Sequence, residues 1–289
     1  MSYLSIRNLS VRLKGGLPLL RRVSLDVAAG EVRGLVGESG AGKSMIGKAV
    51  LGILPPAAEI TEGEILLDGT DLLRLSPADR RRHVGATCAL IPQDPLTALN
   101  PSHRIGPQIT DRLVDILGWS RADAVARARA LMAEVQIPEP DRVLRAYPHE
   151  LSGGMRQRIL IASAFAAEPK LIVADEPTTA LDVTVQKQIL KLIAGMQARH
   201  GTALLFVTHD LGVVSKVCQR LSVLYSGMVV EDTPVADFFA GPRHSYSAAL
   251  LAATPKYTDP AAGLNPVPAD VIAAVRAEVA AFDRRAAHG

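Results

Sequence analysis

The sequence has few cysteines and lacks a long hydrophobic run. Of its 289 residues only two are cysteines, Cys88 and Cys218. Both lie in apolar surroundings without metal-ligand spacing, so we expect neither a disulfide framework nor a metal cluster, as is typical of a reducing cytosol. The N-terminus has no charged-then-apolar signal pattern. The longest apolar candidate, 159–167, is about half of the roughly 18 residues that a membrane span requires. Any work at a membrane is therefore expected at its surface.

An excess of charge of one sign is also missing. The net charge of +3 is too small to indicate a nucleic-acid partner. The basic cluster at 80–82, followed by His83, is more typical of a solvated helix end than of a phosphate or lipid contact. With 48% hydrophobic and 21% charged residues the composition is that of a globular protein. The length allows one substantial α/β core with a smaller lobe, or two domains.

One stretch near the start matches the phosphate-loop pattern G-x-x-x-x-G-K-[ST]. It follows a strand-like run, 32–36, and precedes helical periodicity over 45–54, which is the setting that this loop requires. Glycines let the backbone adopt positive φ and turn its N–H groups towards a polyphosphate, and the helix adds its dipole. Lys43 would reach the β and γ phosphates, and the Ser44 hydroxyl would bind a magnesium ion. The predicted nucleotide-binding residues are Gly37, Glu38, Ser39, Gly40, Ala41, Gly42, Lys43 and Ser44.

The flanking sequence predicts a β layer and a helical lobe. Residues 3–36 alternate with the two-residue period of strands, interrupted by turn signals at 14–16 and 28–30. A further strand is predicted over 61–68, ending in an Asp-Gly turn. We interpret these as an antiparallel β layer that leads into the strand before the phosphate loop. From 107 to about 145 the periodicity becomes helical, with Ile109, Leu113, Ile116 and Leu117 on one apolar stripe, which indicates a separate helical lobe.

Short apolar runs in the second half predict a parallel sheet. Buried strands are expected over 171–174, 203–207 and 221–224, with a helix over 185–199 between the first two. A short buried strand is also expected over 88–91. Alternation of strands and helices on this scale favours a doubly wound parallel sheet, and therefore an α/β fold.

Two adjacent acids follow the first of these buried strands. Asp175 and Glu176 would lie at the carboxyl end of a parallel strand, where open α/β sheets bind ligands. Asp175 can hold magnesium, directly or through water, and Glu176 can take a proton from the water that attacks the γ phosphate. A carboxylate would serve a small-molecule kinase as well, so the pair alone leaves the phosphate acceptor open.

A second anion site is predicted at 151–155, Leu-Ser-Gly-Gly-Met. Ser152, Gly153 and Gly154 stand at the N-terminus of a predicted helix, where backbone N–H groups and the helix dipole favour negative charge. The chain then has two phosphate sites but one nucleotide loop. We infer that the second site serves the nucleotide of a neighbouring subunit.

Three further residues complete an ordered set of motifs. Gln93 follows the short strand at 88–91, Asp182 follows the acidic strand end, and His209 stands in the run Val-Thr-His-Asp. With the phosphate loop, the LSGGM run and LIVADE at 171–176, the chain resembles the ATP-binding subunit of an ABC transporter over roughly 3–240. The resemblance implies a P-loop NTPase (ABC ATPase) core with a parallel sheet, an antiparallel β subdomain and a helical subdomain.

The resemblance also implies roles. Two such subunits would pair head to tail, each LSGGM run closing on the other's ATP. Gln93 would touch the magnesium or the attacking water and report nucleotide state to the membrane partner. His209 would bond the γ phosphate and orient the water beside Glu176, and Asp182 would link the two sites. The cofactors would be ATP and Mg²⁺.

Four longer segments of the sequence resemble those of the dipeptide, oligopeptide and nickel importers, a subgroup of this family. The segments that carry this resemblance are 91–95, 99–101, 147–158 and 174–184. Members of that group work with a second, different ATPase subunit, two transmembrane permeases and an extracytoplasmic solute-binding protein. The resemblance thus implies a peripheral protein at the cytoplasmic face of the plasma (inner) membrane, with no nucleic-acid partner.

The sequence departs from that pattern in three ways. Leu13 stands where the family commonly stacks an aromatic ring on adenine; it can pack on the base but lacks the aromatic face. Ser245 replaces a usual proline in the trailing motif at 242–251. The cysteine cluster that many members carry afterwards is missing. The chain ends instead in a predicted helix over 270–287 with one apolar face, which would pack on its own subunit or dock on a partner.

We therefore expect an ABC ATP-binding domain over 1–240, with a helical subdomain at about 96–168, and a C-terminal extension over 241–289. The predicted function is ATP hydrolysis that drives import of peptides, with residues 94–105 as the candidate permease groove. Nickel, opine or sugar import by the same subgroup stays open. A non-transport ABC ATPase and a small-molecule kinase are alternatives, but the kinase leaves LSGGM and His209 unexplained.

Overall fold

The computed structural model describes residues 2–179, 181–254 and 266–288, which form two compact units. The first unit comprises 1–4, 27–31 and 66–206, and the second 5–26, 32–65 and 207–289. Each is described by itself.

The first unit contains the parallel strands that were predicted around the acidic pair. Strands β6 (Cys88–Ile91) and β7 (Leu171–Asp175) pair in parallel, with Cys88 opposite Leu171 and Ile91 opposite Ala174. Strand β8 (Ala203–Val207) neighbours β7 on its other side. All these strands are nearly continuous runs of buried apolar residues, as expected where helices cover both faces of a sheet. The predicted bounds of β6 and β8 are confirmed.

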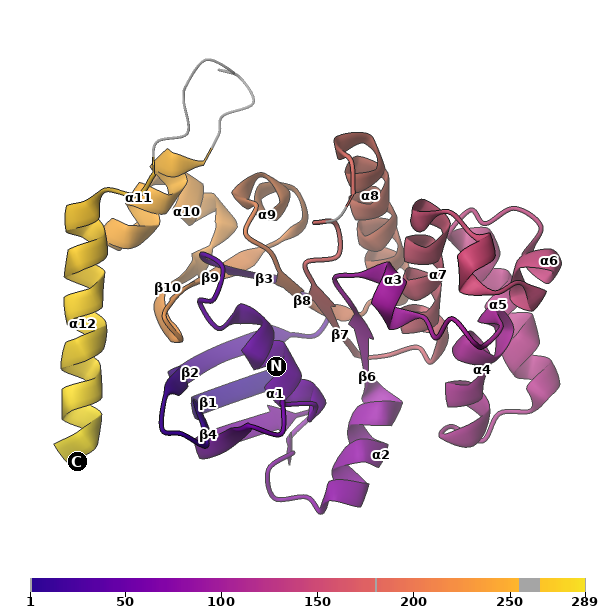
Figure 1. Cartoon of the computed structure of the whole chain (residues 1–289), viewed down its shortest axis with the longest axis horizontal. Helices are drawn as coiled ribbons and strands as arrows, with labels where there is room; N and C mark the ends of the chain where they lie inside the picture. Colours follow the sequence, from indigo (N-terminus) through magenta and orange to yellow (C-terminus); the bar gives the residue numbers. More distant parts are fainter. Residues whose placement is uncertain (1, 180, 255–265, 289) are drawn as a thin grey trace. The chain divides into compact units, whose positions relative to one another are not determined.

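The helical lobe predicted from the sequence also lies in this unit (Figure 1). Buried side chains at helical spacing, among them Ile109, Leu113, Ala128 and Leu131, pack its helices against one another. Ile116, predicted on one apolar stripe with Ile109 and Leu113, is exposed instead, because the helix ends one residue before it. The helices of the first unit, within and outside this lobe, are α2 (Pro77–Thr87), α3 (Pro95–Ala98), α4 (Ile105–Asp115), α5 (Arg121–Glu134), α6 (Pro140–Arg145), η1 (Pro148–Glu150), α7 (Gly153–Ala166) and α8 (Val183–His200).

The second unit contains most of the predicted β layer. Strand β1 (Ser2–Leu13) lies between β2 (Pro18–Ala28) and β4 (Ala58–Leu67). Burial alternates along part of each strand, as at Leu9 and Val11 of β1, Val23 and Leu25 of β2, and Ile65 and Leu67 of β4. In the first unit, the end of β4 pairs antiparallel with β5 (Thr70–Asp71). The connecting Asp-Gly turn has positive φ at both residues, 49° and 75°, as the sequence predicts for a two-residue hairpin.

The second unit also holds the strand that leads into the phosphate loop. Strand β3 (Val32–Val36) pairs in parallel with β9 (Arg220–Tyr225), and β9 pairs antiparallel with β10 (Met228–Pro234). Helix α1 is shorter than the sequence predicted, so Ile53 lies beyond its end and is exposed. The helices of this unit are α1 (Lys43–Leu51), α9 (Leu211–Val217), α10 (Val235–Ala240), α11 (Ser245–Ala253) and α12 (Ala269–His288).

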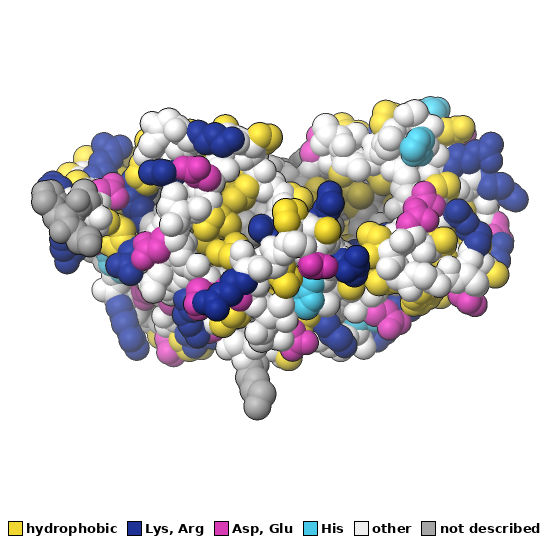
Figure 2. Space-filling model, turned by 90° about the horizontal axis from the view of Figure 1, so that it is seen from below, with side chains coloured by type: hydrophobic (Ala, Val, Ile, Leu, Met, Phe, Trp, Pro, Cys, Tyr) yellow, Lys and Arg dark blue, Asp and Glu magenta, His cyan; other side chains and the backbone are white. Residues whose placement is uncertain are grey.

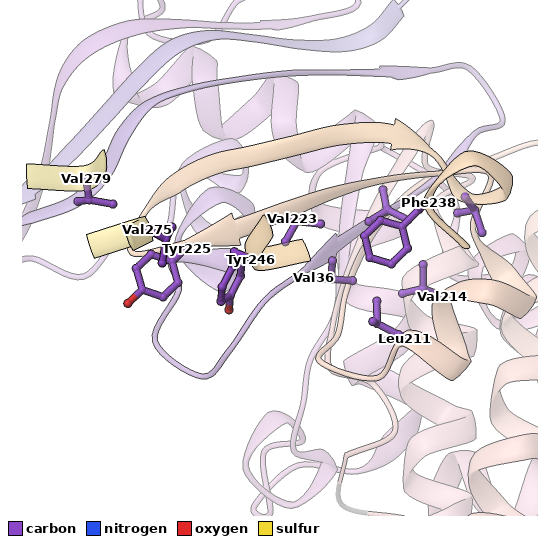
Figure 3. Close-up of a cluster of buried hydrophobic side chains, with 11 residues drawn as sticks. Val36, Leu211, Val214, Val223, Tyr225, Phe238, Tyr246, Val275 and Val279 are labelled. Atoms are coloured by element: carbon purple, nitrogen blue, oxygen red, sulfur yellow. The ribbon is translucent and has the colours of Figure 1, made fainter. Parts of the chain in front are cut away.

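The C-terminal helix packs on its own chain. Val275 and Val279 of α12 are buried in one cluster with Tyr225 and Tyr246 (Figure 3). Val271 and Ile272 pack against the same cluster. Of the two alternatives left by the sequence, packing on the chain itself is thus the one that the structure shows.

Charge on the surface is mixed. Figure 2 shows Lys and Arg side chains interspersed with Asp and Glu over the face that it draws. Cys88 and Cys218 are free thiols, and burial raises their pKa to about 11 and about 12. No helix among the residues that the structure describes combines the length and apolar character needed to cross a bilayer.

Candidate nucleotide site

The phosphate loop in the second unit has the backbone that its glycines predict. The φ angles of Gly37, Gly40 and Gly42 are 148°, 81° and 99°. A Cβ at Gly37 would lie 2.3 Å from the carbonyl oxygen of Leu224, and one at Gly42 would lie 2.9 Å from Cδ2 of Leu20. Glycine is therefore required at these two positions by both conformation and space.

Lys43 begins helix α1, and its ammonium group lies inside the loop. Nζ donates to the carbonyl oxygens of Gly37 at 2.8 Å and Glu38 at 2.9 Å, and only 5% of the residue is exposed. Ser44 follows in the first turn of the same helix. The loop therefore holds a positive charge next to its own N–H groups, which is what binding of a polyphosphate requires.

His209 follows β8, in the second unit, and is exposed. The N–H of Thr208 donates to the carbonyl oxygen of Leu35 at 3.1 Å, which ties the histidine segment to the strand before the loop. Asp210 caps α9 by accepting from the N–H groups of Gly212 and Val213. The backbone on both sides of His209 is thus fixed by hydrogen bonds.

The first unit brings Gln93 and the acidic pair together. Asp175 ends β7, and Gln93 follows the paired strand β6. Nε2 of Gln93 donates to Oε2 of Glu176 at 3.3 Å, and Oγ1 of Thr179 donates to the same oxygen at 2.9 Å. Glu176 has a φ of +46°, an unusual value for a residue with a side chain. Two donated hydrogen bonds therefore hold the Oε2 atom of Glu176 in place.

The LSGGM run stands at a helix N-terminus, as predicted. Ser152 caps α7, its Oγ accepting from the N–H of Met155 at 3.3 Å. Ser152 and Gly153 are exposed, and no atom lies within 4 Å of a Cβ built on Gly153. This end of α7 is therefore open in the first unit and can accept an anion from outside it.

One buried contact was missed at the sequence level. Gln157 is fully buried in α7, and its Nε2 donates to the carbonyl oxygen of Pro177 at 2.8 Å. It thereby joins the helix of the LSGGM run to the segment after Glu176. The signal in the sequence that could have revealed this contact is Gln157 itself, a polar residue on a helix face whose following residues, Leu160 and Ile161, are apolar and buried.

Leu13 lies at the turn that ends β1, and Asp182 caps a helix. Leu13 ends β1 and donates its N–H to the carbonyl oxygen of Leu17 at 2.8 Å, so both are in one hairpin turn. Asp182 caps α8, with Oδ1 accepting from the N–H groups of Thr184 and Val185 at 3.0 Å. Ala180, part of the motif before Asp182, lies outside the described residues.

The residues fit a magnesium ion that comes with its nucleotide. Within the described parts of the chain, no three His, Cys, Asp or Glu side chains form a metal-binding group. Mg²⁺ is usually held by one or two protein oxygens and by phosphates rather than by an all-protein cage. Each unit offers one oxygen of that kind, the hydroxyl of Ser44 in the first turn of α1 and the carboxylate of Asp175 at the end of β7.

A glycine loop of this conformation before a helix, with a carboxylate pair at the end of a parallel strand, defines a P-loop α/β nucleotide-binding protein. The family model described as ABC transporter matches residues 20–179. The chain belongs to the ABC transporter family, as the motifs predicted.

Relatives share a large part of the chain. It is 47% identical to the probable peptide ABC transporter ATP-binding protein y4tR of Sinorhizobium fredii, over 87% of this chain and 76% of the relative. Its identity to the probable D,D-dipeptide transport ATP-binding protein DdpD of Escherichia coli is 45%, over 89% and 79%. For the oligopeptide transport ATP-binding protein OppD of Bacillus subtilis it is 44%, over 87% and 72%.

Solved structures confirm the predicted fold class. The structure of cbiO1 from Clostridium perfringens, part of the ABC transporter complex cbiONQ, has a TM-score of 0.72 at 25% identity, over 83% of this chain and 91% of the other. A dimeric post-hydrolysis state of the ATP-binding cassette MJ0796, bound to ADP and Pi, has a TM-score of 0.71 at 25% identity, over 80% and 98%.

Proposed function

We propose that this chain is the ATP-hydrolysing subunit of an ABC importer, coupling Mg-ATP binding and hydrolysis to uptake of peptides through partner permeases. The observation that carries the proposal is the Lys43 ammonium group inside a glycine phosphate loop, in a chain 47% identical to a peptide ABC transporter ATP-binding protein. Import of nickel, opines or sugars by the same subgroup is the alternative within the class.

Each group of site residues has one task in this proposal. Lys43 and the N–H groups of the loop bind the β and γ phosphates, while Ser44, Gln93 and Asp175 would hold Mg²⁺. Bound there, Mg²⁺ would supply positive charge that offsets the negative charge of the phosphates. Glu176 takes the proton of the attacking water, and His209 orients that water and the γ phosphate. Thr179 and Gln93 keep the carboxylate of Glu176 in place through their donated hydrogen bonds.

The open end of α7 supports a second part of the proposal. Ser152, Gly153 and Gly154 bind the ATP of a partner ATPase, and Asp182 lies at that subunit contact. MJ0796, one of the similar structures, is a dimer with ADP and Pi. We expect the partner to be a different chain, as the subgroup suggests. Leu13 then packs on adenine, and the ATP-binding domain covers 1–240, with 241–289 as an extension.

The segment 94–105 is the proposed permease contact. It follows Gln93 directly, and Leu96 within it is an apolar residue that is 63% exposed. A side chain of this kind on α3 suits a helix of a membrane partner. The subunit would then work peripherally at the cytoplasmic face of the membrane, with a solute-binding protein on the other side of the complex.

The proposal is tested by pull-down from solubilised membranes with tagged Glu176→Gln protein and Mg-ATP, followed by mass spectrometry. Removing the base traps the closed dimer. Two multi-spanning proteins and a second ATPase should be recovered, and the companion binding protein should bind peptides. The double variant that also carries Lys43→Ala should recover less of the second ATPase. Ribosomal or DNA-repair proteins without a permease would refute transport, and phosphate transfer to a small acceptor would support a kinase.

A further inference from the structure

The turn between β9 and β10 supports the phosphate loop. The N–H of Gly227 donates to the carbonyl oxygen of Ala41, inside the loop, at 2.8 Å. At the end of β9, the carbonyl oxygen of Leu224 lies against Gly37, where no Cβ would fit. Ser226 and Gly227 both have positive φ, 46° and 76°, so this turn has one tight backbone conformation. A displacement of the turn therefore displaces the loop.

Helix α12 holds the same turn through polar contacts. Asp283 accepts from Nε and Nη2 of Arg21 at 2.8 and 3.0 Å, a bidentate ion pair. Nη1 of Arg21 donates to the carbonyl oxygen of Ser226. The N–H of Arg21 donates to the carbonyl oxygen of Gly227 at 2.8 Å. Nearer the N-terminus of the same helix, Nε of Arg276 donates to the hydroxyl of Tyr225 at 3.3 Å.

Apolar packing continues this support. The ring of Tyr225, at the end of β9, meets the ring of Tyr246 edge to face, with 4.8 Å between centroids (Figure 3). Both belong to the buried cluster that also contains Val275 and Val36, the residue before the phosphate loop. Burial, with the charge of Glu38 adding to it, raises the pKa of Tyr246 and keeps its hydroxyl protonated beside the loop.

We propose that α12 positions the phosphate loop for ATP, with Asp283 and Arg276 as positioning residues that act through Arg21 and the turn at 225–228. A glycine-rich loop has many backbone conformations, and binding must select one of them. A support that selects the conformation beforehand lowers the entropy cost of binding. The inference rests on ATP binding by this loop, as proposed above.

The test is the affinity of the full chain for a fluorescent ATP analogue with Mg²⁺. Asp283→Asn keeps the shape of the side chain but removes its charge. In Arg21→Lys the single ammonium group cannot donate to Asp283 and to Ser226 in the way that the guanidinium group does. We expect each to weaken binding roughly three- to tenfold, and Asp283→Glu to restore most of it. In the assembled ATPase the KM for ATP should rise while kcat stays unchanged. The control is Glu59→Gln: Glu59 pairs with Arg12 at 2.7 Å in the β layer and, like Asp283, is 40% exposed.

Amide hydrogen exchange separates positioning from general stability. In Asp283→Asn, exchange should quicken in 38–44 and in the turn, and stay unchanged in β1 and β4. The proposal is overturned if the folded variants keep wild-type affinity and loop exchange, or if Glu59→Gln has the same effect. Should Asp283→Asn fail to fold, Arg276→Ala provides the same test, because Arg276 is exposed. Failure of the wild-type chain to bind ATP would instead refute the proposed function.

Discussion

The side-chain amide of Gln93 donates to the carboxylate of Glu176 at 3.3 Å, although the two residues are 83 positions apart in the chain. Parallel pairing of β6 with β7 makes this possible, because both residues follow the carboxyl ends of adjacent strands. The residue proposed to sense nucleotide state therefore touches the residue proposed to act as base. Movement of the segment after Gln93 would change the position of the base directly.

Thr179 should matter for catalysis through the same carboxylate. Its hydroxyl donates to Oε2 of Glu176 at 2.9 Å. Thr179→Ala should lower kcat for ATP hydrolysis roughly three- to tenfold, since one charge-assisted hydrogen bond is lost, with little change in ATP affinity. Steady-state phosphate release measures this. Thr179→Ser, which keeps the hydroxyl, is the control, and an equal loss in both variants would contradict the assignment.

Gly42 should tolerate no side chain. Gly42→Ala places a Cβ 2.9 Å from Leu20 at a φ of 99°. We expect a loss of about 1–3 kcal/mol in the free energy of unfolding, from strain at this φ, together with loss of ATP binding. Chemical denaturation and nucleotide titration measure the two effects. Gly195→Ala is the matched control: Gly195 is exposed inside α8, and alanine there should stabilise the protein by about 0.5–1 kcal/mol.

Gln157 should be required for stability. Its Nε2 satisfies the carbonyl oxygen of Pro177 in a fully buried position. Gln157→Met keeps the length but leaves that oxygen without its donor, at a cost of about 1–3 kcal/mol in urea denaturation. Gln188→Met, at an exposed position, should cost less than 0.5 kcal/mol, about what surface substitutions cost. Similar losses of unfolding free energy in both variants would show that the buried contact of Gln157 stabilises the fold no more than an exposed side chain does.

Glu231 should make stability depend on acidic pH. Burial raises its pKa, but several interactions lower it: the N–H groups of Arg243 and His244, donated at 2.9 and 3.1 Å, the hydroxyl of Ser247 and the charge of His244. Together they hold the pKa of Glu231 below its ordinary value of 4.5. A depressed pKa means that the ionised group stabilises the fold above pH 4.5 and that this contribution is lost as pH falls through the lower, folded value. Glu231→Gln should flatten that part of the profile of unfolding free energy against pH. An unchanged slope below pH 4.5 would refute this assignment.

Local signals in the sequence predicted much of the fold and the backbone of the phosphate loop. The phosphate loop, β6 and β8 were placed by glycine spacing and short apolar runs, which depend on neighbouring residues only. The contact of Gln157 with Pro177 and the pair of Arg21 with Asp283 were not predictable in this way, because they join distant segments whose approach depends on tertiary packing. Ile116 was misplaced because periodicity does not mark where a helix ends.

The pair of Arg21 with Asp283 spans 262 positions of the chain. A ribosome synthesises the glycine loop well before residue 283, so the loop emerges long before the residue that supports its neighbouring turn. During synthesis the nascent subunit thus holds the phosphate-binding sequence without its final support. On the proposed role of α12, firm capture of ATP would be acquired only once residue 283 has been synthesised, after the intervening parts of the chain have had time to fold.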